Sequence, residues 1–297
     1  MIESIKQKAT EHGIKLAVLP MDCILDVKDD MEKLVKSNLL NRRLKWIEEE
    51  RYLFKNHTFQ PKSILVALWK LNLAELIVNH KGKKKSCIVS DIYYPTTDKQ
   101  NILKELFSKY GYSLDYIYWI PHKNFAVHSG LCEYGRNNLT YNDEYGSFIR
   151  IEVFITDAPA EDYMWREMVN MPIFDTYEKC MNSCPTKVIL PDKFLIDSKF
   201  CISYLTCEES EMPDWVSKPV PFRLVECLYC QDICPINQHR LKNLDRIEFG
   251  EIETEIMLNS ASYADFPDNI KNRFWHYNYG EAYEFIPRNL KLLLEKD

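Results

Sequence analysis

Long apolar runs are absent from this sequence of 297 residues. No window approaches the roughly 18 consecutive apolar residues of a membrane-spanning helix. The first residues do not combine a basic start with an apolar stretch of secretory length, so we expect a cytoplasmic protein that makes no membrane contact. Because 46% of the residues are hydrophobic, the chain can bury a sizeable core in one large domain or two modest ones.

An excess of positive charge is absent as well. The chain has 38 Lys and Arg against 44 Asp and Glu, a formal net charge of -6. This balance argues against a protein that coats nucleic acid, because such binding depends on clustered basic residues. One basic run, from His80 to Lys85, is read as a solvated turn, with phosphate contact as the alternative.

Cysteine, in contrast, is abundant and clustered. Seven of the ten cysteines lie between Cys180 and Cys234. Disulfides are rare in the reducing cytoplasm. We therefore expect these cysteines to bind metal.

Short runs of β-branched and aromatic residues alternate with helical patterns in the first 160 residues. The runs predict strands at residues 15–20, 63–69, 86–91, 116–121 and 147–157. A helix is predicted over 96–111, with Thr97 as its N-cap and Gly111 as its stop, and a second helix over 29–54. The expected fold class is α+β.

The pattern changes after about residue 165. Cysteine and proline punctuate short segments up to residue 240, as expected for a loop-rich module in which metal bonds replace a large core. Helical patterning returns in the last 55 residues. We therefore expect an α/β domain over 1–165, a metal module over 166–240, and a helical segment over 241–297 that packs on the other two.

The cysteine spacing can be compared with that of two-cluster ferredoxins. Those proteins repeat C-x2-C-x2-C-x3-C-P, and the fourth cysteine of each run ligates the cluster of the other run. Here Phe174 and Tyr177 stand at the first two positions of the first run, and Leu224 stands at the first position of the second. Both runs are therefore incomplete.

One complete ligand set nevertheless survives. If the two runs exchange their last cysteines as in ferredoxins, and one cysteine from the segment between them completes the set, the sequence predicts a [4Fe-4S] cluster. Its ligands are Cys184, Cys201, Cys227 and Cys230. The other site retains only Cys180 and Cys234 as a remnant. Cys207 either joins these two in a second metal site or is a buried reduced thiol. A zinc site with four thiolate ligands is the alternative to the cluster.

A family resemblance rests on three stretches of this module, CMNSCPTKVIL, FCISYLT and CLYCQDICPIN. In this order they resemble the cluster module of epoxyqueuosine reductases, cobalamin-dependent iron–sulfur enzymes related to corrinoid reductive dehalogenases. Residues 128–157 are similar to that family's glycine-rich cobalamin loop and the strand after it. The resemblance implies a corrinoid-binding domain over 1–165 and a ferredoxin-like module over 166–240. The implied cofactor-binding residues are Gly130, Tyr134, Gly135, Arg136, Asn137 and Asn138.

The sequence departs from the family at the catalytic acid. Epoxyqueuosine reductases carry an aspartate three residues before a proline ahead of the glycine loop, and here Tyr118 stands three residues before Pro121. Tyr118 is therefore the candidate catalytic residue, although a strand tyrosine is more often a packing residue. His122 and His128 are read as structural, with proton donation or axial cobalt ligation as the alternative.

Together these features predict an oxidoreductase. The cluster is expected to deliver single electrons to a bound corrinoid that reduces a small electrophilic substrate, with an external donor such as ferredoxin or flavodoxin. The missing acid predicts a divergent paralogue with a substrate other than epoxyqueuosine, and the net charge gives no support for tRNA as a partner. The alternatives are a 4Fe-4S electron-transfer protein without corrinoid and a zinc-stabilised binding module.

Overall fold

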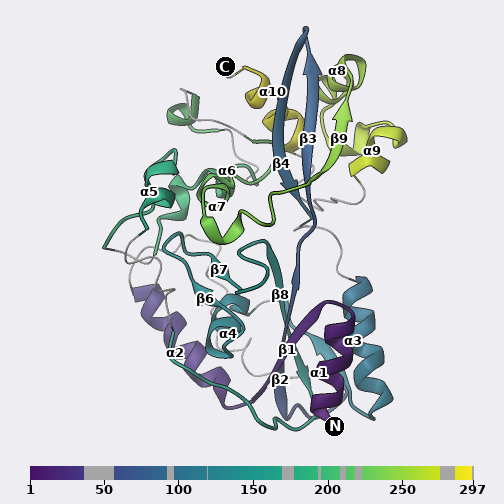
Figure 1. Cartoon of the computed structure of the whole chain (residues 1–297), viewed down its shortest axis with the longest axis vertical. Helices are drawn as coiled ribbons and strands as arrows, with labels where there is room; N and C mark the ends of the chain where they lie inside the picture. Colours follow the sequence, from purple (N-terminus) through teal and green to yellow (C-terminus); the bar gives the residue numbers. More distant parts are fainter. Residues whose placement is uncertain are drawn as a thin grey trace. The chain divides into compact units, whose positions relative to one another are not determined.

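The computed structural model describes residues 1–36, 57–91, 97–118, 120–168, 177–192, 195–207, 212–217, 223–274 and 285–295. Contacts divide the chain into two compact units, drawn in Figure 1. The first unit comprises Met1–Lys70 and Thr96–Thr176, and the second comprises Leu71–Pro95 and Tyr177–Asp297. Both units contain helices and strands, which confirms the predicted α+β class. The three-part division at residues 165 and 240 stays a prediction.

The first unit is built on a four-stranded antiparallel sheet. Its strands follow the order β1 (Ile14–Pro20), β2 (Ser63–Lys70), β8 (Ile149–Thr156) and β5 (Leu114–Tyr116). Strand β2 is buried on both faces. This position explains its unbroken apolar run, because neither face of the strand meets water.

Helices cover both faces of this sheet. Helices α1 (Ile2–Glu11) and α3 (Thr97–Lys109) lie on one face, and α4 (His122–His128) packs on the other face, as Figure 1 shows. The apolar side of α3 meets alternate residues of β2 in a shared core. Its buried residues are Leu103, Leu106 and Phe107, which confirms the predicted helix and its apolar face. The predicted helix over 29–54 begins within α2 (Cys23–Lys36), and its residues 37–54 lie outside the described part.

The strand predicted over 116–121 is wrong. Strand β5 ends at Tyr116, and the chain then bends at Tyr118 before Pro121 becomes the N-cap of α4. Proline has no backbone N–H for a ladder and suits a helix start. The aromatic residues of this stretch therefore resemble a strand in composition without forming one.

The second unit is built on a three-stranded sheet in the order β4 (Lys83–Ser90), β3 (Leu73–His80) and β9 (Asp245–Phe249). Strands β3 and β4 form a hairpin through Lys81 and Gly82, whose φ angles of 50° and 72° suit a two-residue primed turn. Strand β9 runs parallel to β3. Neither β3 nor β9 was predicted, and β9 lies within the segment expected to be helical.

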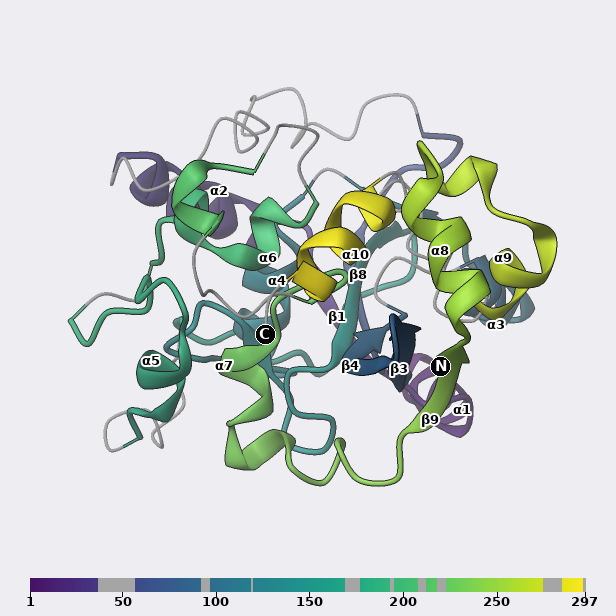
Figure 2. The same cartoon turned by 90° about the horizontal axis from the view of Figure 1, so that it is seen from above.

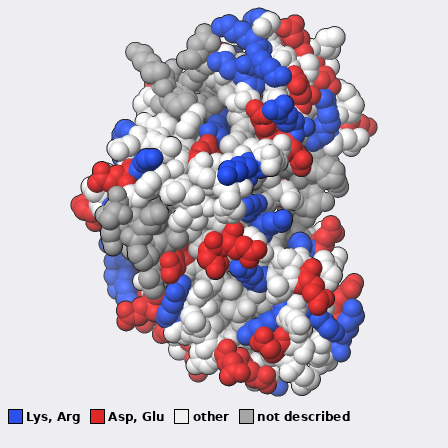
Figure 3. Space-filling view, viewed as in Figure 1, with Lys and Arg blue, Asp and Glu red and all other residues white. Residues whose placement is uncertain are grey.

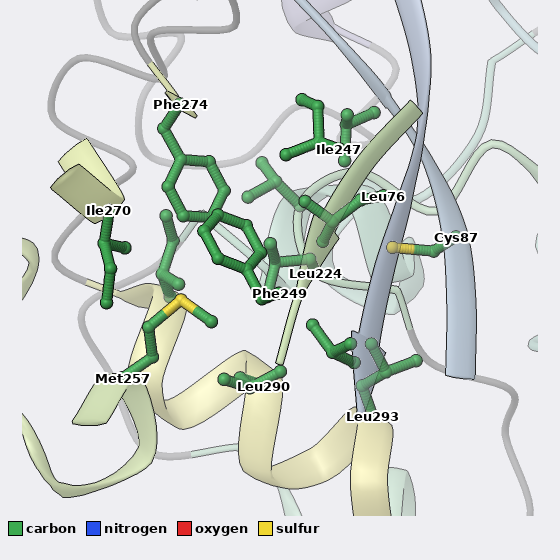
Figure 4. Packing of buried hydrophobic residues seen from close by; sticks show 14 of the residues in the cluster. Leu76, Cys87, Leu224, Ile247, Phe249, Met257, Ile270, Phe274, Leu290 and Leu293 are labelled. Carbon is green, nitrogen blue, oxygen red and sulfur yellow. The ribbon is translucent and has the colours of Figure 1, made fainter. Parts of the chain in front are cut away.

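The α-helices described after β9 in this unit are α8 (Glu251–Asn259), α9 (Asp268–Phe274) and α10 (Ile286–Glu295). Helices α8 and α10 pack against each other, as Figure 2 also shows. Figure 4 shows the core between the sheet and these helices, with Phe249 stacked on Phe274 at 4.9 Å between ring centroids. Leu290 of α10 and Met257 of α8 close the same core.

The cysteine-rich segment of this unit consists of short elements. They are α5 (Lys179–Ser183), α6 (Ile202–Leu205), α7 (Tyr229–Asp232) and the 3-10 helices Ser198–Phe200, Asp214–Ser217 and Pro235–Asn237. This loop-rich character agrees with the pattern predicted for a metal module. Across the described ranges, no helix has the length and apolar character needed to cross a membrane.

Candidate metal centre and glycine loop

The four predicted cluster ligands lie on these short elements of the second unit. Cys184 is the C-cap of α5, Cys201 is the N-cap of α6, Cys227 precedes α7, and Cys230 lies within α7. None of these four cysteines forms a disulfide. Ser183 of α5 donates a hydrogen bond of 3.2 Å to the carbonyl of Tyr229, which ties α5 to α7.

Electrostatics place three of these thiols near one another. Burial is the main cause that raises the pKa of Cys227 to about 12, and the neighbouring Cys201 and Cys184 raise it further. Burial and Cys184 likewise raise the pKa of Cys201. The raised pKa values keep the Cys201 and Cys227 thiols protonated, and binding of iron would release their protons.

Apolar side chains surround the same cysteines. Cys184 packs in a cluster with Ile189 and the half-buried Cys230, and Cys227 packs with Ile202 and Val216 in another. An apolar shell limits water access and tunes the potential of an iron–sulfur cluster. The donor set and its surroundings therefore fit a [4Fe-4S] cluster.

The loop around Cys227 has an uncommon backbone. Glu226 and Leu228, on either side of it, have φ angles of 59° and 58°, in the left-handed region that few non-glycine residues adopt. Glu226 is held by Ser90, whose hydroxyl donates to its carboxylate at 2.8 Å, and burial raises its pKa to about 7. Such strain persists where the surroundings fix it, and it is frequent at binding sites.

The remnant site has a tyrosine beside its two cysteines. Cys180 and Cys234 are 2% and 1% exposed. The Tyr177 hydroxyl donates to the carbonyl of Ile233 at 2.5 Å. Burial raises the pKa of Tyr177, and Cys234 and Cys180 raise it further, so the phenol lies close to both thiols. Phe174 lies outside the described residues.

Cys207 packs elsewhere, against the apolar core of the second unit. Its surroundings favour the reading as a reduced structural thiol. Among the described residues, no three His, Cys, Asp or Glu side chains converge on a position for one metal ion.

The glycine loop of the first unit follows α4 and includes the short strands β6 (Glu133–Tyr134) and β7 (Thr140–Tyr141). A Cβ on Gly130 would lie 2.4 Å from Met164 Sδ, and one on Gly135 would lie 2.4 Å from a ring atom of Tyr141. Asn137 also donates to the Tyr141 hydroxyl at 2.9 Å. These glycines therefore allow close packing of the protein's own side chains, which explains them without a flat ligand.

Polar groups beside this loop include Lys123, a candidate that the sequence reasoning missed. Its Nζ donates to the backbone carbonyl and Oδ1 of Asn138 at 2.9 and 3.2 Å and lies 5.9 Å from the Tyr134 ring centroid. Burial lowers the pKa of Lys123 to about 8. The only available signal was its place two residues after Pro121, which does not reveal burial.

Asn124 adds a second donor at this loop. The Tyr134 hydroxyl donates to its Oδ1 at 3.1 Å, while its buried Nδ2 has no hydrogen-bond partner among the described residues. A buried amide donor without an acceptor costs free energy. This donor set fits a ligand rich in amide and phosphate oxygens, such as a corrinoid.

Tyr118 lies in the same unit and is 56% exposed. Its ring meets that of Tyr116 edge to face, with centroids 6.2 Å apart. Burial and the nearby Glu152 raise the pKa of Tyr116. The buried Glu152 carboxylate accepts a hydrogen bond from Gln100 at 2.9 Å. Tyr118 thus contacts Tyr116, which lies near this buried carboxylate.

Both histidines near the loop make structural contacts. The ring nitrogens of His122 lie 2.8 Å from the carbonyl of Ile117 and 3.1 Å from that of Ile151. Those of His128 lie 2.5 Å from the carbonyl of Arg166 and 2.7 Å from Asp30. These contacts occupy all four ring nitrogens, which favours the structural reading over axial ligation or proton donation.

Comparisons with known proteins agree with the cysteine pattern. Residues 178–237 match the family model described as a 4Fe-4S double cluster binding domain. An epoxyqueuosine reductase of Cyclobacterium marinum is 35% identical over 120 residues, which are 40% of this chain and 37% of that relative. The match thus spans well under half of the relative's length.

Solved structures extend the likeness in fold. That of epoxyqueuosine reductase from Bacillus subtilis has a TM-score of 0.70 at 19% identity and covers 99% of this chain and 80% of the other. A structure of epoxyqueuosine reductase with an epoxyqueuosine-modified tRNA stem loop gives 0.69 at 19% identity, with the same coverage. The comparisons confirm the resemblance to epoxyqueuosine reductases, the iron–sulfur module and the fold.

Proposed function

We propose that this chain is an iron–sulfur reductase that uses a bound corrinoid, as its resemblance to epoxyqueuosine reductases implies. The observation that carries the proposal is the grouping of Cys184, Cys201 and Cys227, with Cys230 on the adjoining helix, inside the matched cluster domain. Four buried or half-buried thiols in apolar surroundings suit a cluster that passes single electrons.

The glycine loop is the proposed corrinoid site. Lys123, Asn124 and the loop residues 136–138 would hold the amide and phosphate groups of the ligand. A bound corrinoid supplies cobalt in a low oxidation state, which reacts with electrophiles. The protein's part is to bind and orient this group and to exclude water.

Proton delivery is the third element of the proposal. Lys123, with its pKa lowered to about 8, is protonated at neutral pH yet releases a proton more readily than an ordinary lysine or phenol. We assign it as the proton donor, with Tyr118 as the alternative. Because neither side chain is the carboxylic acid of the family, we propose a substrate other than epoxyqueuosine, either a small free electrophile or an electrophilic group carried on RNA.

An anaerobic assay tests this proposal. The cluster-loaded chain should bind cob(II)alamin saturably, with a change in the visible spectrum. With a strong reductant, it should reduce epoxyqueuosine in an RNA stem loop about 10²- to 10⁴-fold more slowly than a relative that carries the aspartate. Turnover equal to that of such a relative would contradict the proposed change of substrate.

An electron-transfer protein without corrinoid is the second candidate. The packing of Met164 against Gly130 and of Tyr141 against Gly135 favours this candidate, because it leaves no open flat surface for a corrin ring at either glycine. Cluster-loaded protein that shows no saturable cobalamin binding would decide for this candidate. The third alternative, a zinc-stabilised module, would contain zinc instead of iron.

A further inference from the structure

Arg223 precedes the cysteines of α7 in the chain, and its side chain is largely buried. The side chain is 13% exposed and forms an ion pair with Asp232, the last residue of α7. Its guanidinium carbon lies 4.5 Å from the centroid of the Tyr229 ring. Both contacts are with the helix that carries the predicted ligand Cys230, so the positive charge of Arg223 is fixed beside the cluster module.

The charge of Arg223 acts on the predicted ligand Cys227. Burial raises the pKa of the Cys227 thiol to about 12, and the nearby guanidinium partly offsets this rise. A cation favours the negatively charged form of a neighbouring group. The same charge would therefore favour added negative charge on a metal centre that the Cys227 thiolate holds.

Exposed charges have a weaker effect on such a centre. Lysine, arginine, aspartate and glutamate side chains are interspersed over the face drawn in Figure 3. Salt screens charges at the surface, whereas a charge in less polar surroundings acts more strongly. A largely buried guanidinium beside α7 thus outweighs an exposed one of the same sign.

Arg246 of β9 provides a direct comparison within the same unit. Arg223 and Arg246 line one cavity of about 640 Å³. Arg246 is paired with the Glu75 carboxylate at 3.0 Å, and its side chain is 74% exposed. The two arginines therefore share a cavity and a carboxylate pairing but differ in burial, which makes Arg246 the matched control for Arg223.

We propose that the Arg223 guanidinium raises the reduction potential of the [4Fe-4S] cluster. Reduction by one electron adds one negative charge to the cluster and its thiolates, and a fixed cation nearby stabilises this charge. Asp232 opposes the effect, because its carboxylate partly balances the guanidinium. The inference rests on the proposed function and deepens it, since it names a residue that sets how readily the cluster accepts an electron.

A purely structural role of Arg223 is the alternative. In that case the ion pair and the ring contact would only hold α7 in place. Substitution would then reduce stability or iron content, but the clusters that still form would keep the wild-type potential. The potential therefore separates the two roles, whereas activity does not.

The test is an anaerobic redox titration of the cluster-loaded full chain, followed by visible absorption and electron paramagnetic resonance. It compares the wild type with Arg223→Gln, Arg223→Lys, Asp232→Asn and the control Arg246→Gln. Arg223→Lys keeps the positive charge but not the planar guanidinium. Asp232→Asn keeps an oxygen that can accept from Arg223 and removes only the negative charge.

At the wild-type midpoint, the ratio of reduced to oxidised cluster should be about tenfold lower in Arg223→Gln, which corresponds to about 59 mV for one electron. Asp232→Asn should raise this ratio, because the guanidinium is then unbalanced. Arg223→Lys should stay within about threefold of the wild type, and Arg246→Gln within about twofold.

Equal ratios in Arg223→Gln and Arg246→Gln would overturn the proposal. So would equal shifts in Arg223→Gln and Arg223→Lys, because the charge would then not be the cause. If Arg223→Gln loses its iron, Asp232→Asn decides alone, and an unchanged ratio in that variant would overturn the proposal. A wild-type chain without an iron–sulfur cluster would overturn the proposed function as well, whereas a cluster with an unchanged potential would overturn this inference alone.

Discussion

Two tyrosines stand at positions where the family resemblance implies other groups. Tyr177 stands where the ferredoxin spacing predicts a cluster cysteine, and its hydroxyl donates to the carbonyl of Ile233, beside Cys234. Tyr118 stands where the resemblance implies an aspartate, and it is more than half exposed. A phenol neither ligates iron as a thiolate does nor releases a proton as a carboxylic acid does. We therefore expect single residues to change the chemistry of this chain while the fold of its relatives is retained.

Cys201 should be indispensable for the cluster. We expect Cys201→Ser to lose most of the bound iron, because Cys201 lies near Cys184 and Cys227, whereas Cys207, the other cysteine between the two runs, packs on the apolar core. The matched control is Cys207→Ser, at a half-buried thiol that packs on the apolar core. Iron analysis after anaerobic purification should find wild-type content in the control. Equal losses in both variants would contradict the ligand assignment.

Lys123 should make stability depend on pH in alkaline solution. Its pKa is lowered from 10.5 to about 8 in the folded chain, so the unfolded chain binds more protons between these values. The free energy of unfolding contributed by Lys123 should therefore rise with pH from about 8 to 10.5. Urea unfolding gives the free energy of unfolding of the wild type and of Lys123→Met at each pH. The wild-type value minus the Lys123→Met value should rise between about pH 8 and pH 10.5. A constant difference would show that Lys123 titrates normally.

Gly135 should be needed for the fold of its loop, independently of any cofactor. A Cβ there would lie 2.4 Å from the Tyr141 ring and 2.6 Å from Asn137 Oδ1. Gly135→Ala should cost about 1–3 kcal/mol of unfolding free energy. At Gly250 the nearest atom is 3.7 Å away, so Gly250→Ala should cost less than about 1 kcal/mol. Thermal unfolding of both variants without cobalamin measures these costs. Equal losses of stability in Gly135→Ala and Gly250→Ala would show that the packing of Tyr141 does not determine the effect at Gly135.

At the scale of elements, burial on both faces distinguishes β2 from the other strands. Its run SILVALW is readable as a strand because every residue from Ser63 to Trp69 is buried. Strand β9 shows the opposite case. It buries only Ile247 and Phe249, and its partner β3 lies far away in the sequence. Long-range parallel pairing of a short polar strand leaves no local signal, so the sequence reasoning could not find it.

The same contrast holds for the candidate site. The cluster cysteines are recognisable because their ligand spacing is local in the sequence and largely independent of the rest of the fold. Lys123 becomes unusual only when Asn138 and Tyr134 fold over it. The packing of Tyr141 against Gly135 likewise cannot be read from the sequence, and the assignment of Gly135 to a cofactor stays a prediction.

Strand β9 should contribute strongly to the stability of the second unit. Phe249 is fully buried and stacks on Phe274 of α9. Phe249→Ala should cost about 3–5 kcal/mol, because it leaves a cavity between sheet and helices. Ile252 is 78% exposed on the adjoining helix, so Ile252→Ala should shift urea unfolding by less than about 0.5 kcal/mol. A small effect at Phe249 would mean that this core is less well packed than Figure 4 indicates.

At the scale of the whole molecule, the chain divides the proposed chemistry between its units. Lys123, Tyr118 and the glycine loop belong to the first unit, whereas the cluster cysteines belong to the second. The chain passes between the units at three places, after Lys70, Pro95 and Thr176. Neither unit is therefore one continuous stretch, and the complete chain is the proper material for functional tests.

We propose that this chain binds one [4Fe-4S] cluster and has lost the second cluster site. The most direct measurement is iron, sulfide and zinc analysis of the anaerobically purified chain, combined with electron paramagnetic resonance after reduction. We expect about four irons and four sulfides per chain and the signal of a single cubane. About eight irons per chain, or zinc in place of iron, would contradict it.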